Sequence, residues 1–282
     1  MRPADVDAKR RSRVRAVSRS KILRLELLCA SVLGGLLCFC IAPAFADGCP
    51  KPADEIETDR PDITNSSRVV PQGSLQFENG INFTTPQSSR VLDGTNTRAR
   101  IGIAPCLEVL VDVPTYFATL SGPAASGFTD VAPAVKWQIS PIPGKIDLSA
   151  VAGIGLPTGT NSLVGPGPQP YVQFPWSWVL TAKWSVNGML TAFFHPSDPV
   201  SKQVYQSTFV LERKVGEKAG VFIEWIGDFP SDAGAHHLLN SGAIYRLSKT
   251  EQIDFHVGAG LNKDAPSFVF GLGYSYRFDR LF

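Results

Sequence analysis

The chain has 282 residues, a formal net charge of +2, and hydrophobic, aromatic and charged fractions of 44%, 10% and 18%. Nine of its 27 basic residues but only three of its 25 acidic residues lie in residues 1–46, so the rest of the chain is net acidic. This distribution argues against a nucleic-acid-binding protein, and the length suits one large or two ordinary domains.

Residues 1–46 have the three parts of a bacterial export signal. A basic stretch at 9–24 is followed by an apolar run at 27–42 and by Ala-Phe-Ala at 44–46, a small-x-small cleavage site. This pattern predicts a cleaved signal peptide and a mature chain that begins at Asp47, and it leaves the true start codon open. The alternative is an uncleaved anchor, because the apolar run approaches the roughly 20 residues that a spanning helix needs.

Beyond the signal, apolar and polar residues alternate with a period of two, which predicts strands rather than helices. The pair Asn187-Gly188 is a signal for a tight hairpin turn. The twelve predicted strands are Gly73–Thr84, Thr97–Ile103, Leu107–Val113, Asp130–Ile139, Lys145–Leu156, Trp178–Val186, Met189–Phe194, Tyr205–Glu212, Val221–Trp225, Ala243–Leu247, Ile253–Leu261 and Ser267–Phe278.

The connections between these strands alternate between short turns and longer loops. Short turns at one edge, long loops at the other and an even strand count are typical of bacterial outer-membrane barrels. The longer loops, rich in Gly, Pro, Ser and Asp, are predicted at 85–96, 118–129, 157–169, 195–203, 228–239 and 262–267.

The face opposite the apolar one distinguishes a barrel from a soluble periplasmic β-sandwich, which is the alternative. A sandwich turns that face to water and fills it with Lys and Glu. Here it carries mostly Gly, Ser, Thr and Gln with isolated charges, as the interior of a closed barrel does. We therefore predict an all-β fold, a transmembrane antiparallel up-and-down β-barrel of about 12 strands over residues 74–282, after a periplasmic segment at 47–73. The last strand has to pair with the first, because lipid leaves an open sheet edge unsatisfied.

Several stretches carry a family resemblance. Ile56-Glu-Thr-Asp-Arg-Pro-Asp62 is the most specific, and Val70–Gly80, Gly155–Gly159, Asp254–Asn262 and Gly273–Phe278 also match. In these stretches the chain resembles the outer-membrane proteins grouped as the MetA-pathway of phenol degradation transporter family. The resemblance covers most of the mature chain and implies a transporter-like barrel, often linked to the catabolism of aromatic compounds.

The predicted function is passive transport of small hydrophobic or aromatic compounds across the bacterial outer membrane. A structural or adhesive barrel without transport is the alternative. The expected partners are outer-membrane lipid, a small-molecule solute and the barrel-assembly machinery, and no cofactor or metal is expected. The residues that look like the assembly signal are Gly273, Tyr276, Phe278 and Phe282.

The stretch from Thr58 to Asp62 precedes the first strand, and two roles stay open for it. It is either a plug or gate whose charges meet those of the lumen, or a structural cap whose charges pair locally. The lumen charges have both signs, so no strong anion or cation filter is indicated, and either a polar passage or a closed ion-paired core remains open. The candidate lumen and gate residues are Asp59, Arg60, Asp62, Glu78, Arg98, Arg100, Asp112, Lys136, Asp147, Lys183, Glu212, Glu224, Arg246, Asp254, His256 and Arg277.

Cys49 and Cys106 are the two cysteines left after cleavage of the signal, and both are predicted on the periplasmic side. Export to an oxidising compartment favours a disulfide between them, worth roughly 4 kcal/mol in the chain-entropy model. The pair His236-His237 is expected in a solvated outer loop. A hydrolase would need a Ser, His and acid set, and His256 has no Ser partner on its own strand, so we predict that the protein is not an enzyme.

Overall fold

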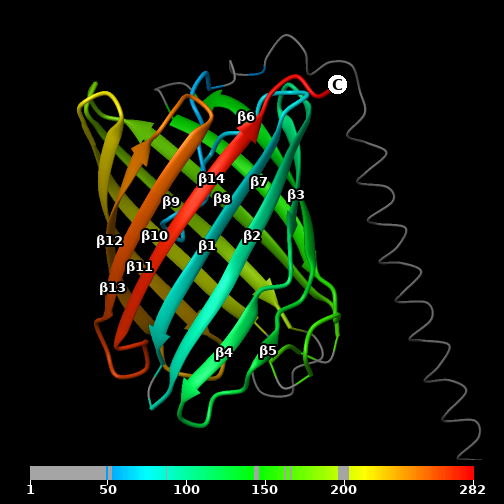
Figure 1. Cartoon of the computed structure of the whole chain (residues 1–282), viewed down its shortest axis with the longest axis vertical. Helices are drawn as coiled ribbons and strands as arrows, with labels where there is room; N and C mark the ends of the chain where they lie inside the picture. The colour runs from blue at the N-terminus through cyan, green and yellow to red at the C-terminus, as the bar shows by residue number, and fades with distance from the viewer. Residues whose placement is uncertain are drawn as a thin grey trace, which may run out of the picture. The chain divides into compact units, whose positions relative to one another are not determined.

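The strands form one continuous sheet that closes on itself (Figure 1). The computed structural model describes residues 49, 53–86, 88–142, 146–161, 163–165, 167–195 and 203–282, and the predicted signal at 1–46 lies outside them. Among the described residues, no helix is both long enough and apolar enough to cross a membrane.

Fourteen strands are present in the described part of the chain. In chain order they are β1 (Leu75–Thr85), β2 (Arg90–Ala104), β3 (Leu107–Asp112), β4 (Tyr116–Ser121), β5 (Gly127–Phe128), β6 (Ala132–Ile142), β7 (Ile146–Gly155), β8 (Gln169–Val179), β9 (Trp184–Phe194), β10 (Gln203–Val215), β11 (Ala219–Pro230), β12 (His236–Arg246), β13 (Glu251–Gly260) and β14 (Phe268–Phe278).

The closing pair is β1 with β14, antiparallel from Leu75↔Phe278 to Thr85↔Phe268. This confirms the predicted pairing of the last strand with the first. β2 pairs with both β3 and β4, and β3 pairs with β6 while β4 pairs with β5. β3 with β4, and β5 with β6, therefore each occupy one position in the wall. The fold is the predicted closed antiparallel barrel of twelve strand positions.

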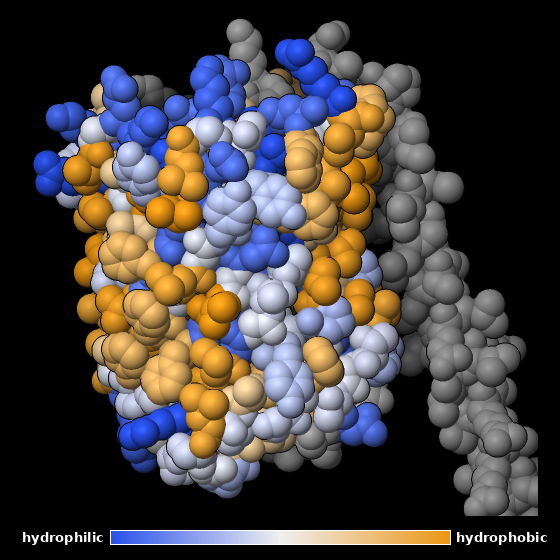
Figure 2. Space-filling model, viewed as in Figure 1, coloured by the Kyte–Doolittle hydropathy of each residue, from blue (hydrophilic) through white to orange (hydrophobic). Residues whose placement is uncertain are grey.

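Exposed apolar and buried polar residues alternate along the strands. On β13, Phe255 is 47% exposed, whereas its neighbours Asp254 and His256 are 5% and 7% exposed. Figure 2 shows apolar side chains over the outer wall and hydrophilic ones mainly at the two ends. This reverses the arrangement of a soluble protein, and it matches a barrel whose outer wall touches hydrocarbon. The end with the short turns and the C-terminus is called the turn end below, and the opposite end the loop end.

The hairpin predicted at Asn187-Gly188 is wrong. Both residues lie inside β9, and the turn is at 180–183. Gly188 serves packing, because a side chain there would overlap the ring of Trp176 on β8. The predicted strand Trp178–Val186 therefore contains the end of β8, a turn and the start of β9. Lys183, predicted on a strand, lies in this turn.

Three of the predicted loops, at 85–96, 118–129 and 228–239, are at least half strand. β2 already begins at Arg90, β4 extends into the predicted loop at 118–129, and β5 lies within that loop. β4 pairs with the loop-end half of β2, from Arg90↔Ser121 to Gly94↔Tyr116. A register shift between Glu78 and Gly80 in the β1–β2 pair interrupts the alternation on which the prediction rested.

His236 and His237 were predicted in an outer loop, but they are the first two residues of β12. The imidazole of His237 stacks on Trp225, with ring centroids 5.7 Å apart, and meets Phe229 edge-on. Aromatic residues on β11 therefore hold this histidine in the wall.

Candidate functional site

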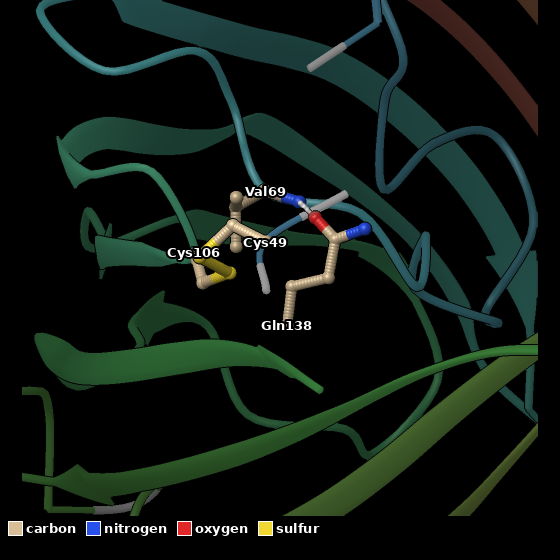
Figure 3. Close-up of a disulfide and its surroundings, with 4 residues drawn as sticks. All are labelled: Cys49, Val69, Cys106 and Gln138. Carbon is tan, nitrogen blue, oxygen red and sulfur yellow. Dashed lines mark hydrogen bonds between the residues drawn. A yellow bond between two sulfur atoms is a disulfide. The ribbon is translucent and has the colours of Figure 1, made fainter. Parts of the chain in front are cut away.

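Residues 53–73, here called the plug segment, run inside the barrel. Ile56 and Val70 are 0% and 3% exposed. One end of the segment leads into β1, and the chain before its other end is fixed by a disulfide between Cys49 and Cys106 in the β2–β3 turn (Figure 3). The plug segment is therefore a loop that is tethered at both ends.

Asp59 is the centre of the contacts between the plug segment and the wall. Its carboxylate lies 3.0 Å from Lys136 Nζ, 3.1 Å from Arg98 Nη1 and 3.3 Å from Arg100 Nη1. Its backbone N–H donates to Glu78 Oε2 at 2.9 Å. Burial alone would raise the pKa of Asp59, but the three cations outweigh burial and lower it below its ordinary range. Asp59 is therefore a buried anion held by three strands.

Arg100 joins the wall to both limbs of the plug segment. Its guanidinium donates to Glu78 at 2.9 Å and forms an ion pair with Glu108 at 2.9 Å. It also donates to the backbone oxygens of Glu57 at 3.1 Å and Arg68 at 2.9 Å. The five N–H donors of one guanidinium thus fix β1, β2 and β3 against the segment.

Arg60 occupies a niche that two glycines create. Its Nη2 donates to Asp254 Oδ1 and to the backbone oxygen of Leu272, both at 3.4 Å. Gly80 and Gly273 lie opposite each other in the β1–β14 pair, and a side chain on either would overlap the Arg60 guanidinium. Gly273 therefore has a packing role in the lumen, which sequence reasoning missed.

The tip of the plug segment, residues 62–65, is hydrogen-bonded to the far wall. Glu224 on β11 accepts bonds from the backbone N–H groups of Ile63 at 3.1 Å and Thr64 at 3.0 Å, and from the Thr64 hydroxyl at 2.8 Å. The Thr64 hydroxyl also lies 2.5 Å from that of Thr208 on β10. The predicted lumen residue Glu224 thus holds the tip rather than standing free.

Amide side chains also hold the plug segment, at its tip and beyond it. Asn65 accepts a bond from Arg98 at 2.9 Å and donates to Gln173 on β8 at 2.9 Å, so it bridges β2 and β8. Gln138 accepts a bond from the backbone N–H of Val69 at 3.1 Å (Figure 3). Sequence reasoning selected charged lumen residues and so missed these amides. The alternation was the signal for Gln138 and Gln173, which lie on strands, whereas Asn65 lies outside the strands.

Three more predicted charges hold the outer parts of the plug segment. Asp147 forms an ion pair with Arg68 at 3.2 Å, and Arg246 forms one with Glu55 at 3.2 Å. Arg277 donates to the backbone oxygen of Glu55 at 3.2 Å.

His256, Glu212 and Lys183 meet other parts of the wall. His256 Nδ1 lies 3.1 Å from Asn240 Oδ1, and Glu212 accepts a bond from the Ser185 hydroxyl at 2.9 Å. Lys183 is exposed in the β8–β9 turn. In the described part of the chain, no three His, Cys, Asp or Glu residues are grouped as a metal site would require.

The lumen also contains apolar residues that were not predicted there. Leu110, Ala134 and Val151 face inward and form a buried cluster against which Tyr171 packs. Met189, from β9, is also only 2% exposed. The inner face of β3, β6 and β7 is therefore partly apolar, although β3 and β6 also carry the buried charges of Glu108 and Lys136.

Two cavities lie among the described residues, and the plug segment lines the one nearer the turn end. The loop-end cavity has a volume of about 520 Å³ and is lined by residues such as Asp112, Asp130, Leu163, Val164, Tyr171 and Phe193. The turn-end cavity has a volume of about 400 Å³ and is lined by residues such as Asp62, Asn65, Arg68, Glu212, Phe222 and Arg246.

Asp62 makes the stability of the plug segment depend on pH. Burial, followed by the nearby carboxylates of Glu224 and Glu212, raises the pKa of Asp62 well above its ordinary range. The folded state thus holds this proton more tightly than the unfolded chain does. The resulting stability is present at low pH and is lost as the pH rises through the folded-state pKa. The lowered pKa of Asp59 has the opposite effect, since its contribution is lost as the pH falls.

Thermal stability should fall both as the pH rises, partly because of Asp62, and as the pH falls, partly because of Asp59. We therefore expect Asp62→Asn to reduce the loss that occurs as the pH rises and to leave the loss that occurs as the pH falls. The measurement is thermal unfolding in detergent over a pH series. Asp54→Asn, an exposed change near the start of the same segment, is the control and should leave both losses unchanged. If the melting temperature of Asp62→Asn fell with rising pH as steeply as that of the unaltered chain, the role assigned to Asp62 would be contradicted.

Comparison with known proteins places this geometry among outer-membrane barrels. A model of the family described as putative MetA-pathway of phenol degradation matches residues 58–278. A NanC porin structure is similar at 7% identity with a TM-score of 0.53, over 72% of this chain and 98% of that one. A KdgM porin matches at 10% identity and a TM-score of 0.47, over 73% and 99%. The CymD monoaromatic hydrocarbon channel matches at 11% and 0.45, over 76% and 90%. At these identities the likeness concerns the fold alone. No curated protein matches the chain.

Proposed function

Because this chain belongs to the family described as the putative MetA-pathway of phenol degradation, we propose that it is a channel of the bacterial outer membrane. Small hydrophobic or aromatic compounds would cross it passively, and no catalytic step is involved. The apolar outer wall supports the membrane location, and the porins and the hydrocarbon channel of similar fold support the transport role.

The observation that carries this proposal is a pair of cavities, one lined by the plug segment near the turn end and one near the loop end. Hydrogen bonds to Glu224, Gln173 and Thr208 hold the tip, which lines the turn-end cavity. Such a bond contributes about 1 kcal/mol net between neutral groups and about 1.5–3 kcal/mol to a charged group. A few bonds of this size allow the tip to shift and connect the two cavities while the strand pairs of the barrel stay intact.

The charged contacts near the turn end keep the rest of the plug segment in place in this proposal. Asp59, Arg60 and Arg100 act as its anchors, so the tip is the gate. The barrel-assembly machinery remains the proposed partner for the C-terminus. Phe278 is 50% exposed and Phe282 76% exposed, which leaves both rings accessible to it.

The test has to use an intact outer membrane, because small apolar solutes cross a plain phospholipid bilayer unaided. The lipopolysaccharide leaflet is the barrier that makes a channel necessary. Cells of a porin-deficient host, with and without the barrel, would be given labelled toluene and a labelled disaccharide. We expect the barrel to raise the initial uptake of toluene and to leave that of the disaccharide unchanged.

A folded barrel is verified in the same cells by its shift on a gel with and without boiling. Equal toluene uptake in the two strains, with the folded barrel present, would refute the proposal and favour a structural barrel.

A further inference from the structure

The loop-end cavity has an aromatic wall. Tyr171 from β8 and Phe193 from β9 face the lumen with ring centroids 5.9 Å apart. Tyr171 lies across Gly153, where a side chain would overlap its ring, and it packs on the apolar cluster from β3, β6 and β7. Leu163 and Val164 also line this cavity. A flat ring entering here would meet aromatic and aliphatic groups.

The β7–β8 loop that borders this cavity is held in place by named bonds. Asp130 Oδ1 accepts bonds from the N–H groups of Thr158 at 3.0 Å and Gly159 at 2.9 Å. Farther along the loop, the N–H of Thr160 donates to the backbone oxygen of Phe128 at 2.9 Å. The family-like stretch Gly155–Gly159 therefore forms a fixed border to the cavity, and the cavity exists before a ligand arrives.

Two carboxylates give the cavity its polar character. Asp112 pairs with Arg98 at 2.6 Å, yet its side chain remains 35% exposed. In the described part of the chain, Oδ1 of Asp130 takes two hydrogen bonds and Oδ2 takes none. Ionised carboxylates only accept hydrogen bonds, so a ligand has to supply the donor. The same charges repel an anionic ligand.

We propose that the loop-end cavity binds neutral aromatic molecules of one ring that carry a hydroxyl or amino donor, and that it discriminates against aromatic carboxylates. The ring lies against Tyr171 and Phe193, and the donor points to Asp130 Oδ2 or Asp112. The volume of about 520 Å³ exceeds the roughly 150 Å³ that suffices for benzene in a protein core. This inference rests on the proposed function for the access of the ligand from outside the cell.

The test is calorimetric titration of the full detergent-solubilised chain with phenol, toluene and benzoate. We expect phenol to bind most tightly, toluene more weakly and benzoate weakest. Asp130→Asn keeps an oxygen for the loop bonds and replaces the free acceptor by a donor. It should weaken phenol about tenfold or more, since hydrogen bonds to charged groups are the stronger ones, leave toluene unchanged and strengthen benzoate.

Two further variants guard against a general loss of folding. Tyr171→Leu should weaken both phenol and toluene, whereas Phe174→Leu, which alters a lipid-facing ring on the same strand that is 46% exposed, should change neither. Equal binding of phenol and benzoate, or an unchanged phenol affinity in a folded Asp130→Asn, would overturn the inference. If cells with the barrel take up toluene but the solubilised chain lacks this binding pattern, only the binding site is overturned. If the chain shows the binding pattern but the cells show no uptake, only the transport role is overturned.

Discussion

Deletion of residues 49–72 together with Cys106→Ser is expected to open the lumen. The deleted stretch supplies Asp59, Arg60 and the tip at 62–65, which together occupy the space between the walls. A twelve-strand barrel is intermediate between filled eight-strand barrels and open porins, so we expect conductance in planar bilayers to rise at least about tenfold over the full chain.

The matched control is the full chain with Cys49→Ser and Cys106→Ser. It loses the tether but keeps the ion pairs of the plug segment, so its conductance should stay near that of the unaltered chain. A deletion variant that still shifts on a gel as a folded barrel, but conducts no better, would mean that the wall side chains themselves close the lumen.

Lys136→Met is expected to lower the free energy of unfolding by about 3–5 kcal/mol, because it removes one of the cations that neutralise two buried carboxylates. The Lys136 side chain is 0% exposed, and its Nζ lies 3.0 Å from Asp59 and 3.2 Å from Glu108. Methionine keeps most of the volume, so the loss reports charge rather than packing. Guanidinium unfolding in detergent measures it.

Lys214→Met is the control for this change, because Lys214 is exposed at the end of β10. It should alter the stability by less than about 1 kcal/mol, as surface charges usually do. A comparably small loss in Lys136→Met would show that the ion pairs contribute little to holding the plug segment.

The period of two was enough to predict the barrel, because every strand has lipid on one side and the lumen on the other. It was not enough to set the boundaries where packing overrides local signals. β8 contains Pro170 and Pro175, which argue against a strand, and β9 contains Asn187-Gly188, which argues for a turn. In the fold, Gly188 makes room for the Trp176 ring, a contact between strands that no local pattern reveals.

The sequence was enough to predict which charged residues face the lumen, but not which groups they contact there. Alternation directs Glu224 inward, yet its partners are backbone groups of Ile63 and Thr64, 161 and 160 residues earlier. Backbone donors have no sequence signature, so the course of the plug segment through the lumen could not be derived. The pairing of Asp59 with Arg98, Arg100 and Lys136 likewise depends on that course.

The central claim is that the tip of the plug segment occupies the lumen, where it lines the turn-end cavity. Thr64→Cys with Thr208→Cys tests it directly, since the two hydroxyl oxygens lie 2.5 Å apart. In native membranes under mild oxidation, we expect peptide mapping to find a disulfide between positions 64 and 208, beside the one that joins Cys49 to Cys106. Two free thiols that both react with maleimide after oxidation would place the tip elsewhere and contradict the account.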